Sequence, residues 1–253
     1  MKLRLQITKE SGIRFISHLE YLKTLEKAIR RARIPVAYSQ GFNPHMKFSL
    51  ASALSVGVTS RAEFLELYLR EPAPLKDLVD ALSCNLPMGI HIVRADLADD
   101  KAPKLMASVA GTTYLVKVPC AADPSDGLQR YERAEKALYT KTHGKGKGSP
   151  RIVDAKAFVP YVQASYEGSM LTLQFDCLVS QEGSMKAAEL LKVLHDDFGL
   201  SLDLEKADIA RLDLYAAGPN GEKRPLLQAD GMTLESGALC QCQTGRNPHG
   251  TGI

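Results

Sequence analysis

The sequence predicts an α+β fold made of two tandem ferredoxin-like (βαββαβ) domains. The first observation is composition, because 45% hydrophobic and 24% charged residues are typical of a folded globular chain. The second is periodicity, since segments with alternating apolar residues and segments with helical spacing follow one another in the order β-α-β-β-α-β. The third is that this order occurs twice within 253 residues, a length that allows two domains. We therefore expect domains over residues 1–97 and 113–217, a linker over 98–112, and a flexible, disordered tail over 218–253.

The first domain is expected to begin with a strand and a capped helix. Apolar and polar residues alternate over residues 2–8, which predicts a strand. Ser17 and Glu20 form the S-x-x-E pattern of a capping box, in which each side chain satisfies a backbone N–H group of the other. Helical spacing of apolar residues then predicts a helix that ends before Pro35. These apolar residues are Leu19, Leu22, Leu25, Ile29 and Ala32.

Three further strands and a second helix complete the first domain. The strands are expected over residues 36–38 with a continuation at 47–50, over 64–70, and over 90–93. Pro74 suits the first turn of the helix, because that turn does not need its N–H group. The apolar face of this helix consists of Leu75, Leu78, Val79 and Leu82.

The second domain repeats the same order of elements without a repeat of individual residues. Its strands are expected over residues 114–118, 153–162, 170–179 and 209–215. A turn at Glu167 and Gly168 joins the second of these strands to the third. One helix is expected over residues 128–138, and another from a cap at Ser184 to Gly199.

The hydropathy pattern argues against a membrane protein and against a secreted one. The longest apolar stretches are interrupted by charged residues, and none approaches the roughly 20 residues that span a bilayer. The first residues alternate like a strand and lack the apolar block of a signal peptide. We therefore expect a cytoplasmic protein without membrane contact. A net charge of +3 is too small by itself to identify a nucleic-acid-binding protein.

The most unusual stretch of sequence covers residues 35–49. Gly41 and the Asn43-Pro44 pair predict a tight turn there. A loop rich in polar and aromatic groups can bind a phosphate or a base through side chains and backbone N–H groups. The alternative, which stays open, is a strand–turn–strand with ordinary turn chemistry. The candidate binding residues in this stretch are Tyr38, Gln40, Asn43, His45 and Lys47.

Two clusters of basic residues are candidates for phosphate contacts. The first consists of Lys23, Lys27, Arg30, Arg31 and Arg33 on the first helix, with Arg14 just before it. A solvated helix end that complements the helix dipole is the alternative. The second cluster is the glycine- and lysine-rich loop over residues 141–151, with Lys145 and Lys147. It lacks the residue order of a nucleotide-binding P-loop, and it either follows an RNA backbone or is a surface insertion.

The sequence contains no motif that identifies a catalytic or metal-binding site. No G-x-S-x-G segment occurs, and the six histidines include no H-x3-H pair. Asp154 stands without a partner carboxylate, which is weak support for catalysis. We therefore predict no catalytic residue, no bound metal and no cofactor. His18 and His45 are the histidines that packing explains least well.

Several short segments resemble a known protein family. They cover residues 14–20, 28–32, 37–45, 56–60 and 63–65, and they include the run Arg-Phe-Ile-Ser-His-Leu-Glu and the run Ser-Gln-Gly-Phe-Asn-Pro-His. They resemble the radical SAM-linked protein family, a domain of unknown function fused to, or encoded beside, radical SAM proteins with a cobalamin-binding-type domain. The resemblance extends over residues 1–217 and is more specific in the first 70. Met46 departs from the family, which commonly has a second proline there.

The resemblance implies an accessory role on RNA or on the translation apparatus. The chain lacks the C-x3-C-x2-C cysteines that hold an iron–sulfur cluster, so radical chemistry would belong to a partner. The leading hypothesis is therefore a substrate-binding or scaffolding partner of a radical SAM protein acting in trans, with RNA as the macromolecule. The expected recognition pocket consists of Arg14, His18, Tyr38, Gln40, Asn43, His45 and Lys47, and the expected phosphate contacts are Arg30, Arg31, Lys145 and Lys147.

Two alternatives stay open at the level of sequence. The first is an enzyme that modifies or cleaves RNA by itself, with His18 or His45 as acid or base. The second is a protein–protein adaptor without affinity for RNA. A salt titration of RNA binding distinguishes them, because phosphate contacts make binding salt-dependent.

Overall fold

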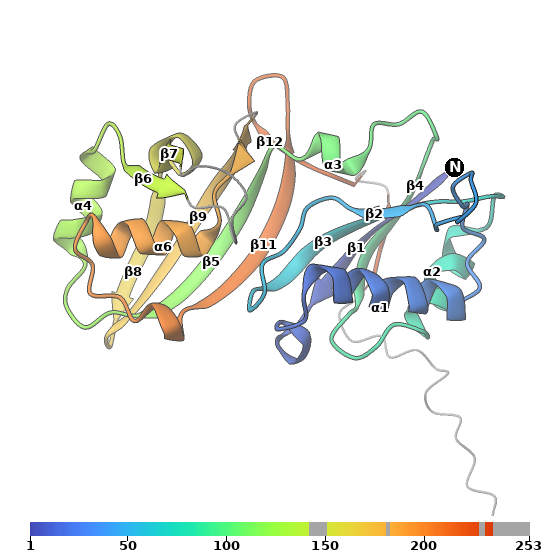
Figure 1. The fold of residues 1–253 in the computed structure, drawn as a ribbon, viewed down its shortest axis with the longest axis horizontal. Coiled ribbons are helices and arrows are strands. Elements are labelled where there is room, and N and C mark those ends of the chain that lie inside the picture. The colour runs from blue at the N-terminus through green and yellow to red at the C-terminus, as the bar shows by residue number, and fades with distance from the viewer. Residues whose placement is uncertain (142–150, 181–182, 228–230, 235–253) are drawn as a thin grey trace, which may run out of the picture. The chain divides into compact units, whose positions relative to one another are not determined.

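The chain has a mixed α/β fold in which two compact units can be distinguished (Figure 1). The computed structural model describes residues 1–141, 151–180, 183–227 and 231–234. Unit 1 comprises residues 1–56, 63–107 and the described residues from 227 onward, and unit 2 comprises residues 57–62 and 108–226.

Unit 1 is built on a sheet with helices on one face. Its strands are β1 (Lys2–Lys9), β2 (Phe48–Leu50), most of β3 (Thr59–Tyr68), β4 (Ile92–Ala98) and β13 (Met232–Thr233). Its helices are η1 (Ser11–Ile13), α1 (His18–Arg31), α2 (Leu75–Ser83) and most of α3 (Leu105–Ser108). The strands lie in the order β2-β3-β1-β4-β13, and β1 and β4 are antiparallel from Lys2↔Ala98 to Ile7↔Ile92.

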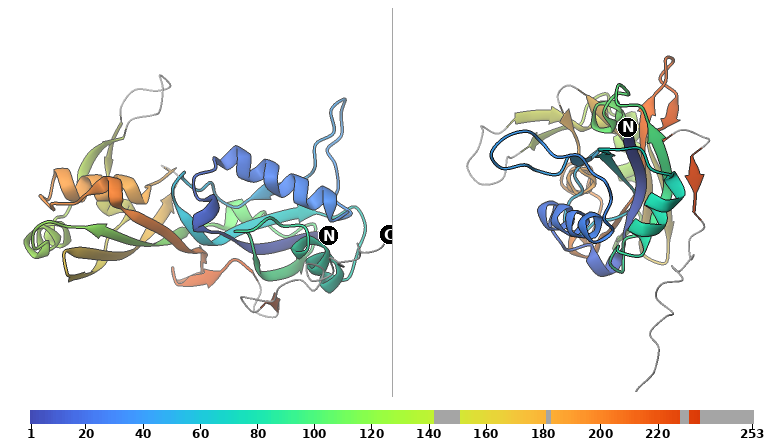
Figure 2. Two further views of the ribbon diagram at one scale, coloured as in Figure 1. Left: turned by 90° about the horizontal axis from the view of Figure 1, so that it is seen from below. Right: turned by 90° about the vertical axis from the view of Figure 1, so that its right-hand side faces the viewer.

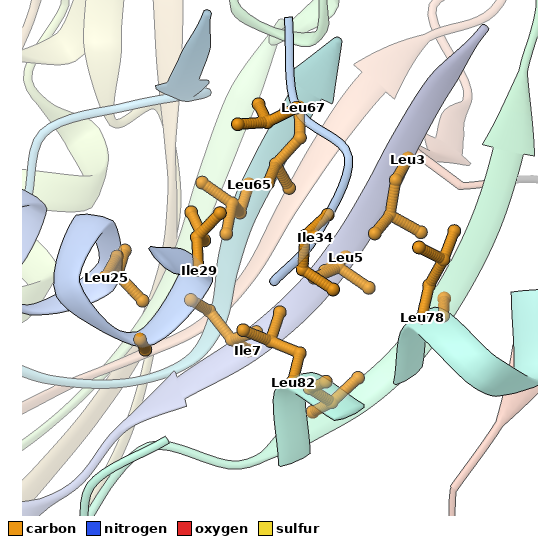
Figure 3. Packing of buried hydrophobic residues seen from close by; sticks show 14 of the residues in the cluster. Leu3, Leu5, Ile7, Leu25, Ile29, Ile34, Leu65, Leu67, Leu78 and Leu82 are labelled. Carbon is orange, nitrogen blue, oxygen red and sulfur yellow. The ribbon is translucent and has the colours of Figure 1, made fainter. Parts of the chain in front are cut away.

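The core of unit 1 lies between this sheet and helices α1 and α2 (Figure 3). Alternate residues of a strand point to the same face, so β1 directs three apolar side chains towards the helices. Helix α1 covers them with residues at helical spacing, and α2 does the same. The labelled core residues are Leu3, Leu5, Ile7, Leu25, Ile29, Ile34, Leu65, Leu67, Leu78 and Leu82.

Unit 2 has its own sheet and helices. Its strands are β5 (Gly111–Pro119), β6 (Leu138–Lys141), β7 (Arg151–Asp154), β8 (Val162–Glu167), β9 (Met170–Ser180), β10 (Gly183–Ser184), β11 (Asp208–Ala217) and β12 (Lys223–Pro225). Its helices are α4 (Ser125–Arg133), α5 (Ala155–Phe158), α6 (Ala187–Asp196) and η2 (Leu204–Lys206). Strand β5 pairs antiparallel with both β9 and β11, β8 pairs with β9, and the first residues of β3 run parallel to β11.

The turn between β8 and β9 lies where the sequence predicts it. Glu167 pairs with Met170, so Gly168 and Ser169 form a two-residue connection. Their φ angles are 55° and 66°, which places both residues in the left-handed region. Two positive φ angles in succession are typical of the type I′ turn, whose twist matches that of a hairpin.

The segment after α4 differs from the expectation. The strand predicted over residues 153–162 is interrupted by α5, because the Asp154 carboxylate accepts hydrogen bonds from the Lys156 N–H (3.0 Å) and the Ala137 N–H (2.9 Å). The carboxylate thereby starts a helical turn in place of a continued strand. The helix predicted to residue 138 ends earlier, since Leu138 already begins β6. Ser184 lies in β10, and α6 begins after Lys186.

Part of the predicted tail is ordered, so the expectation of disorder from residue 218 is wrong for that part. Strand β12 pairs with β11, and β13 pairs with β4. Leu226 and Leu227, between these two strands, are buried. Edge pairing explains the order of these segments, because each short strand satisfies backbone groups of a neighbouring strand. Across the described residues, no helix has the length and apolar character needed to cross a bilayer.

Candidate substrate-binding site

The start of α1 is fixed by the capping box that the sequence predicts. The Glu20 N–H donates to Ser17 Oγ (3.2 Å), and the Ser17 N–H donates to Glu20 Oε2 (2.7 Å). These bonds to Ser17 hold the pKa of the Glu20 carboxyl below its ordinary value of 4.5. The carboxylate is therefore charged where the helix dipole favours a negative charge. The box places His18 at the first position of the helix.

A buried tyrosine anchors the same end of α1 to the sheet. The Tyr21 hydroxyl donates to the Thr8 carbonyl at the end of β1 (2.8 Å). Burial raises the pKa of Tyr21 far above its ordinary value, so this hydroxyl keeps its proton. His18 is therefore carried by a helix whose first turn is held both by its cap and by the sheet.

Residues 38–46, which we call the arm, belong to the connection between α1 and β2 that projects from the body of unit 1 (Figure 2). Tyr38 and Met46 form an isolated bridge at its base. Above them the Ser39 N–H donates to the His45 carbonyl (2.8 Å), and the His45 N–H donates to Ser39 Oγ (2.9 Å). These bonds hold the backbone at His45 in a defined position.

The apex of the arm, residues 40–44, is exposed. Gly41 has a φ of 126°, a conformation that side chains disfavour and glycine accepts. Phe42 has a relative exposure of 105%, so its ring is open to solvent. Gln40, Asn43 and Pro44 are exposed as well. The apex is thus a surface feature and contributes nothing to the core.

A pocket of about 370 Å³ lies in unit 1 between α1, the base of the arm, β2 and α3. Its walls are mostly apolar, and its polar groups are two imidazoles, one ammonium, one carboxylate and one hydroxyl. The lining residues are His18, Leu19, Leu22, Lys23 and Glu26 of α1, His45 and Met46 of the arm, Phe48, Ser49 and Leu50 of β2, and Met106 of α3. An apolar cavity with a few convergent polar groups is the usual form of a small-ligand site.

Of the predicted recognition residues, His18 and His45 lie in this pocket. Tyr38, Gln40, Asn43 and Lys47 are exposed on the arm or just after it. Arg14 is half-buried, and its guanidinium lies over the Phe15 ring, 4.9 Å from the centroid. The predicted set thus lies on two segments of unit 1, and of its members the pocket lining contains His18 and His45.

The two arginines predicted to contact phosphate have different environments. Arg30 is exposed and donates to Glu26 Oε1 (2.7 Å), an ion pair of the i,i+4 type. Arg31 donates to the Asn85 carbonyl just beyond α2 (2.7 Å), so its guanidinium helps to attach α1 to that segment. The Arg30 guanidinium is exposed, so exchanging the half-buried Glu26 carboxylate for another anion costs little. Arg31 would lose its hydrogen bond to Asn85 in such an exchange. Lys145 and Lys147 lie outside the described residues.

The pocket lining also contains residues that the sequence did not indicate as part of a site. Leu19 and Leu22 belong to the apolar spacing that predicted the helix. Leu22 packs against the core and also lines the pocket, whereas Leu19 is 68% exposed and lines the pocket. The buried face of α1 is formed by Tyr21, Leu25, Ala28 and Ile29. The spacing of residues 19, 22, 23 and 26 marks a second face of the same helix, and that spacing was a usable signal. Met106 comes from the predicted linker, where no local pattern indicates a site.

Asp154, the isolated carboxylate, has a structural role as the cap of α5. Among the described residues, no group of three or more His, Cys, Asp or Glu side chains could hold a metal ion. The pocket's polar groups are instead suited to hydrogen bonding and to proton transfer.

Comparisons with known proteins give one family match. A family model described as "Uncharacterized protein conserved in bacteria (DUF2344)" matches residues 2–187. No curated protein matches the chain in sequence. A chain in the crystal structure of a Cbf5-Nop10-Gar1 complex is 10% identical, with a TM-score of 0.48, and the match covers 84% of this chain and 48% of that one. An unknown protein from Galdieria sulphuraria is 12% identical, with a TM-score of 0.23, and the match covers 83% of this chain and 97% of that one. This chain thus spans about half the length of the first structure, and TM-scores below 0.5 carry no argument about function.

Proposed function

This chain belongs to the DUF2344 family of bacterial proteins, and we propose that it is an accessory protein that binds RNA on unit 1 and presents it to a radical SAM enzyme. The resemblance of residues 14–20 and 37–45 to radical SAM-linked proteins supports the choice of partner. The absence of C-x3-C-x2-C cysteines from the sequence agrees with a supporting role, because the cluster would then belong to the enzyme.

The observation that carries the proposal is the pocket between α1 and the base of the arm. Its polar groups come from three separate segments, and two of them, His18 and His45, belong to the stretches that resemble the family. Lys23 contributes a positive charge to the same lining. Imidazoles and an ammonium beside an exposed loop form a surface that complements a polyanion with hydrogen-bonding bases.

Further cations lie along α1 beyond the pocket. Lys27 and Arg30 are exposed on the helix, and Lys47 is exposed where the arm returns to the sheet. Basic residues placed around a pocket provide contacts to phosphate groups, while the pocket itself can read a base. We assign Lys23, Lys27, Arg30 and Lys47 to phosphate contacts, and we leave Arg31 out because its guanidinium bonds to Asn85.

We also propose that both units are ferredoxin-like. The strand order β2-β3-β1-β4 in unit 1 supports this, and β8-β9-β5-β11 in unit 2 is its counterpart. In each unit the first strand pairs antiparallel with the last one. This arrangement is the split βαβ form of a βαββαβ domain.

A salt titration of RNA binding tests the proposal. Each phosphate contact contributes roughly −0.7 to the slope of log K against log salt for single strands. The combined variant Lys23→Ala and Arg30→Ala should make the slope shallower by about one unit or more. Lys76→Ala is the matched control, because its side chain is exposed on α2 and pairs with Asp80. No RNA affinity in the unaltered protein, together with salt-independent binding of a protein partner, would support the adaptor role instead.

One observation favours a second candidate, an RNA-cleaving enzyme that acts by itself. His18 and His45 line one cavity, and two imidazoles can act as base and acid on the 2′-hydroxyl and the leaving 5′-oxygen. Purified protein incubated with end-labelled RNA should then give cleavage that disappears in both His18→Ala and His45→Ala. His91→Ala is the control, since His91 lies outside the pocket and near Glu10. Cleavage that persists in both pocket variants would point to a contaminating nuclease.

A further inference from the structure

We infer that the pocket on α1 holds a single unpaired nucleobase, so that the RNA bound by unit 1 is single-stranded at that point. This inference rests on the proposed function, because it takes RNA as the ligand and specifies its form. It assigns the pocket to the base and the exposed cations to the backbone.

The size and lining of the pocket favour a base over a phosphate group. A volume of about 370 Å³ lies within the range of small-ligand sites, roughly 300 to 1,000 Å³. Leu19, Leu22 and Met106 provide apolar walls that a charged phosphate would have to enter with loss of hydration. Glu26 adds a carboxylate, which is paired with Arg30 and offers a phosphate no hydrogen-bond donor. The flat, uncharged part of a nucleotide is therefore the part that fits.

The remaining groups match what a base needs. Phe48 and the two imidazoles provide aromatic surfaces of the kind on which bases stack. The ring nitrogens of His18 and His45, the Ser49 hydroxyl and the Glu26 carboxylate can bond to the edge of a base. Glu26 is suited to accept a hydrogen bond from an exocyclic amino group, as carboxylates do with cytosine.

The form of the RNA follows from the position of these groups. A base inside a duplex presents only its groove edges, and its faces are covered by its neighbours. A pocket lined on several sides can take a base only after the base has left the stack. Lys23 lies in the same lining, where it can meet the phosphate next to the inserted nucleotide.

The experiment compares a single-stranded RNA containing one 2-aminopurine with the same RNA annealed to its complement. The full-length protein should bind the single strand at least about tenfold more tightly than the duplex, and the 2-aminopurine fluorescence should change on binding. The double variant Leu19→Ala and Met106→Ala removes two pocket walls at positions that are 68% and 60% exposed, so the fold is expected to persist. Its affinity should fall roughly threefold to tenfold, the fluorescence change should disappear, and the salt slope should stay the same.

Met88→Ala is the matched control, because Met88 is 90% exposed and lies outside the pocket lining. It should bind like the unaltered protein. Equal affinity for single strand and duplex, or a double variant with unaltered affinity and fluorescence, would overturn the inference. The inference about the nucleobase could fail while the combined variant Lys23→Ala and Arg30→Ala still made the salt slope shallower. RNA binding by unit 1, the proposed function, would then stand. If the protein bound neither the single strand nor the duplex, the proposed function itself would be wrong.

Discussion

The two units of the chain share an order of elements and differ most in one connection. In unit 1, the segment between α1 and β2 contains the arm, whose apex is exposed. In unit 2, the corresponding segment between α4 and β8 contains β6, β7 and α5, and Ala155 and Phe158 of α5 are buried. Among the described residues, one connection thus exposes its apex, and the other contributes side chains to a core. The difference teaches that the candidate site combines the base of a loop with the helix and strand that carry it, as is common for binding sites.

The largest expected effect compares how much the core of unit 1 and the apex of the arm contribute to the free energy of unfolding. Leu25→Ala removes a fully buried side chain from the core of unit 1 and should lower the free energy of unfolding by about 2 to 5 kcal/mol. Phe42→Ala removes an even larger apolar side chain from the apex and should change stability by less than about 0.5 kcal/mol. Chemical denaturation followed by circular dichroism measures both. A large loss with Phe42→Ala would mean that the apex packs against something.

The second effect concerns a thiol buried in unit 2. Burial raises the pKa of Cys177 to about 11 from an ordinary value of 9.0, and its Sγ lies 2.9 Å from the Met185 carbonyl oxygen. At pH 8 the thiolate fraction should therefore be roughly a hundredfold lower than in the unfolded chain. Alkylation with iodoacetamide, followed by peptide mass spectrometry, should show Cys177 protected in the native protein and reactive in denaturant. Rapid native labelling would show that this part of unit 2 opens readily.

The third effect compares equivalent polar contacts in the two connections. Asp154→Ala removes the cap of α5 and should lower stability by about 1 to 2 kcal/mol while leaving RNA affinity unchanged. Ser39→Ala removes the acceptor for the His45 N–H in the arm, and it should cost less than about 1 kcal/mol. We expect this arm variant to weaken RNA binding about threefold to tenfold, because a loosely held His45 fits its ligand less well. If Asp154→Ala weakened RNA binding and Ser39→Ala left it unchanged, the assignment of binding to the arm would be wrong.

The smallest effect concerns the pH dependence of the α1 cap. The pKa of Glu20 is lowered in the folded state, so its contribution to stability is present above the unfolded pKa. This contribution is lost as the pH falls through the folded pKa. An NMR titration of the Glu20 carboxyl should give a midpoint below 4.5, and Ser17→Ala should move it upward. A midpoint at the ordinary value would contradict the capping box.

Local patterns predicted several individual elements of the fold. Alternation identified β1, the S-x-x-E pattern identified the start of α1, and the Glu167-Gly168 pair identified a hairpin turn. Each of these signals depends on residues within a few positions of one another. Strand β13 was missed because its order comes from the edge of β4, far away in sequence. Strand β12 lies only a short turn after β11, but its residues Lys223, Arg224 and Pro225 show no alternation of apolar and polar residues.

The site was predictable to a lesser degree. The stretches containing His18 and His45 stood out by composition, but the meeting of the two histidines in one cavity required the folded chain. The pair Glu26 and Arg30 has i,i+4 spacing and could have been foreseen. The bond from Arg31 to Asn85 joins two distant segments, so no local pattern announces it.

The segment after β4 determines where a stable fragment of unit 1 has to end. The Lys2 ammonium donates to the Ala102 carbonyl, and the Arg4 guanidinium donates to the Pro103 carbonyl and to Glu66. Both basic side chains are buried, so a fragment cut at residue 98 would remove the Ala102 acceptor of Lys2 and leave Arg4 with Glu66 alone. A fragment extended to residue 108 would keep those acceptors, the whole of α3 and Met106 beside the pocket. Anyone who expresses unit 1 separately should therefore place the cut after the short helix and not after the last long strand.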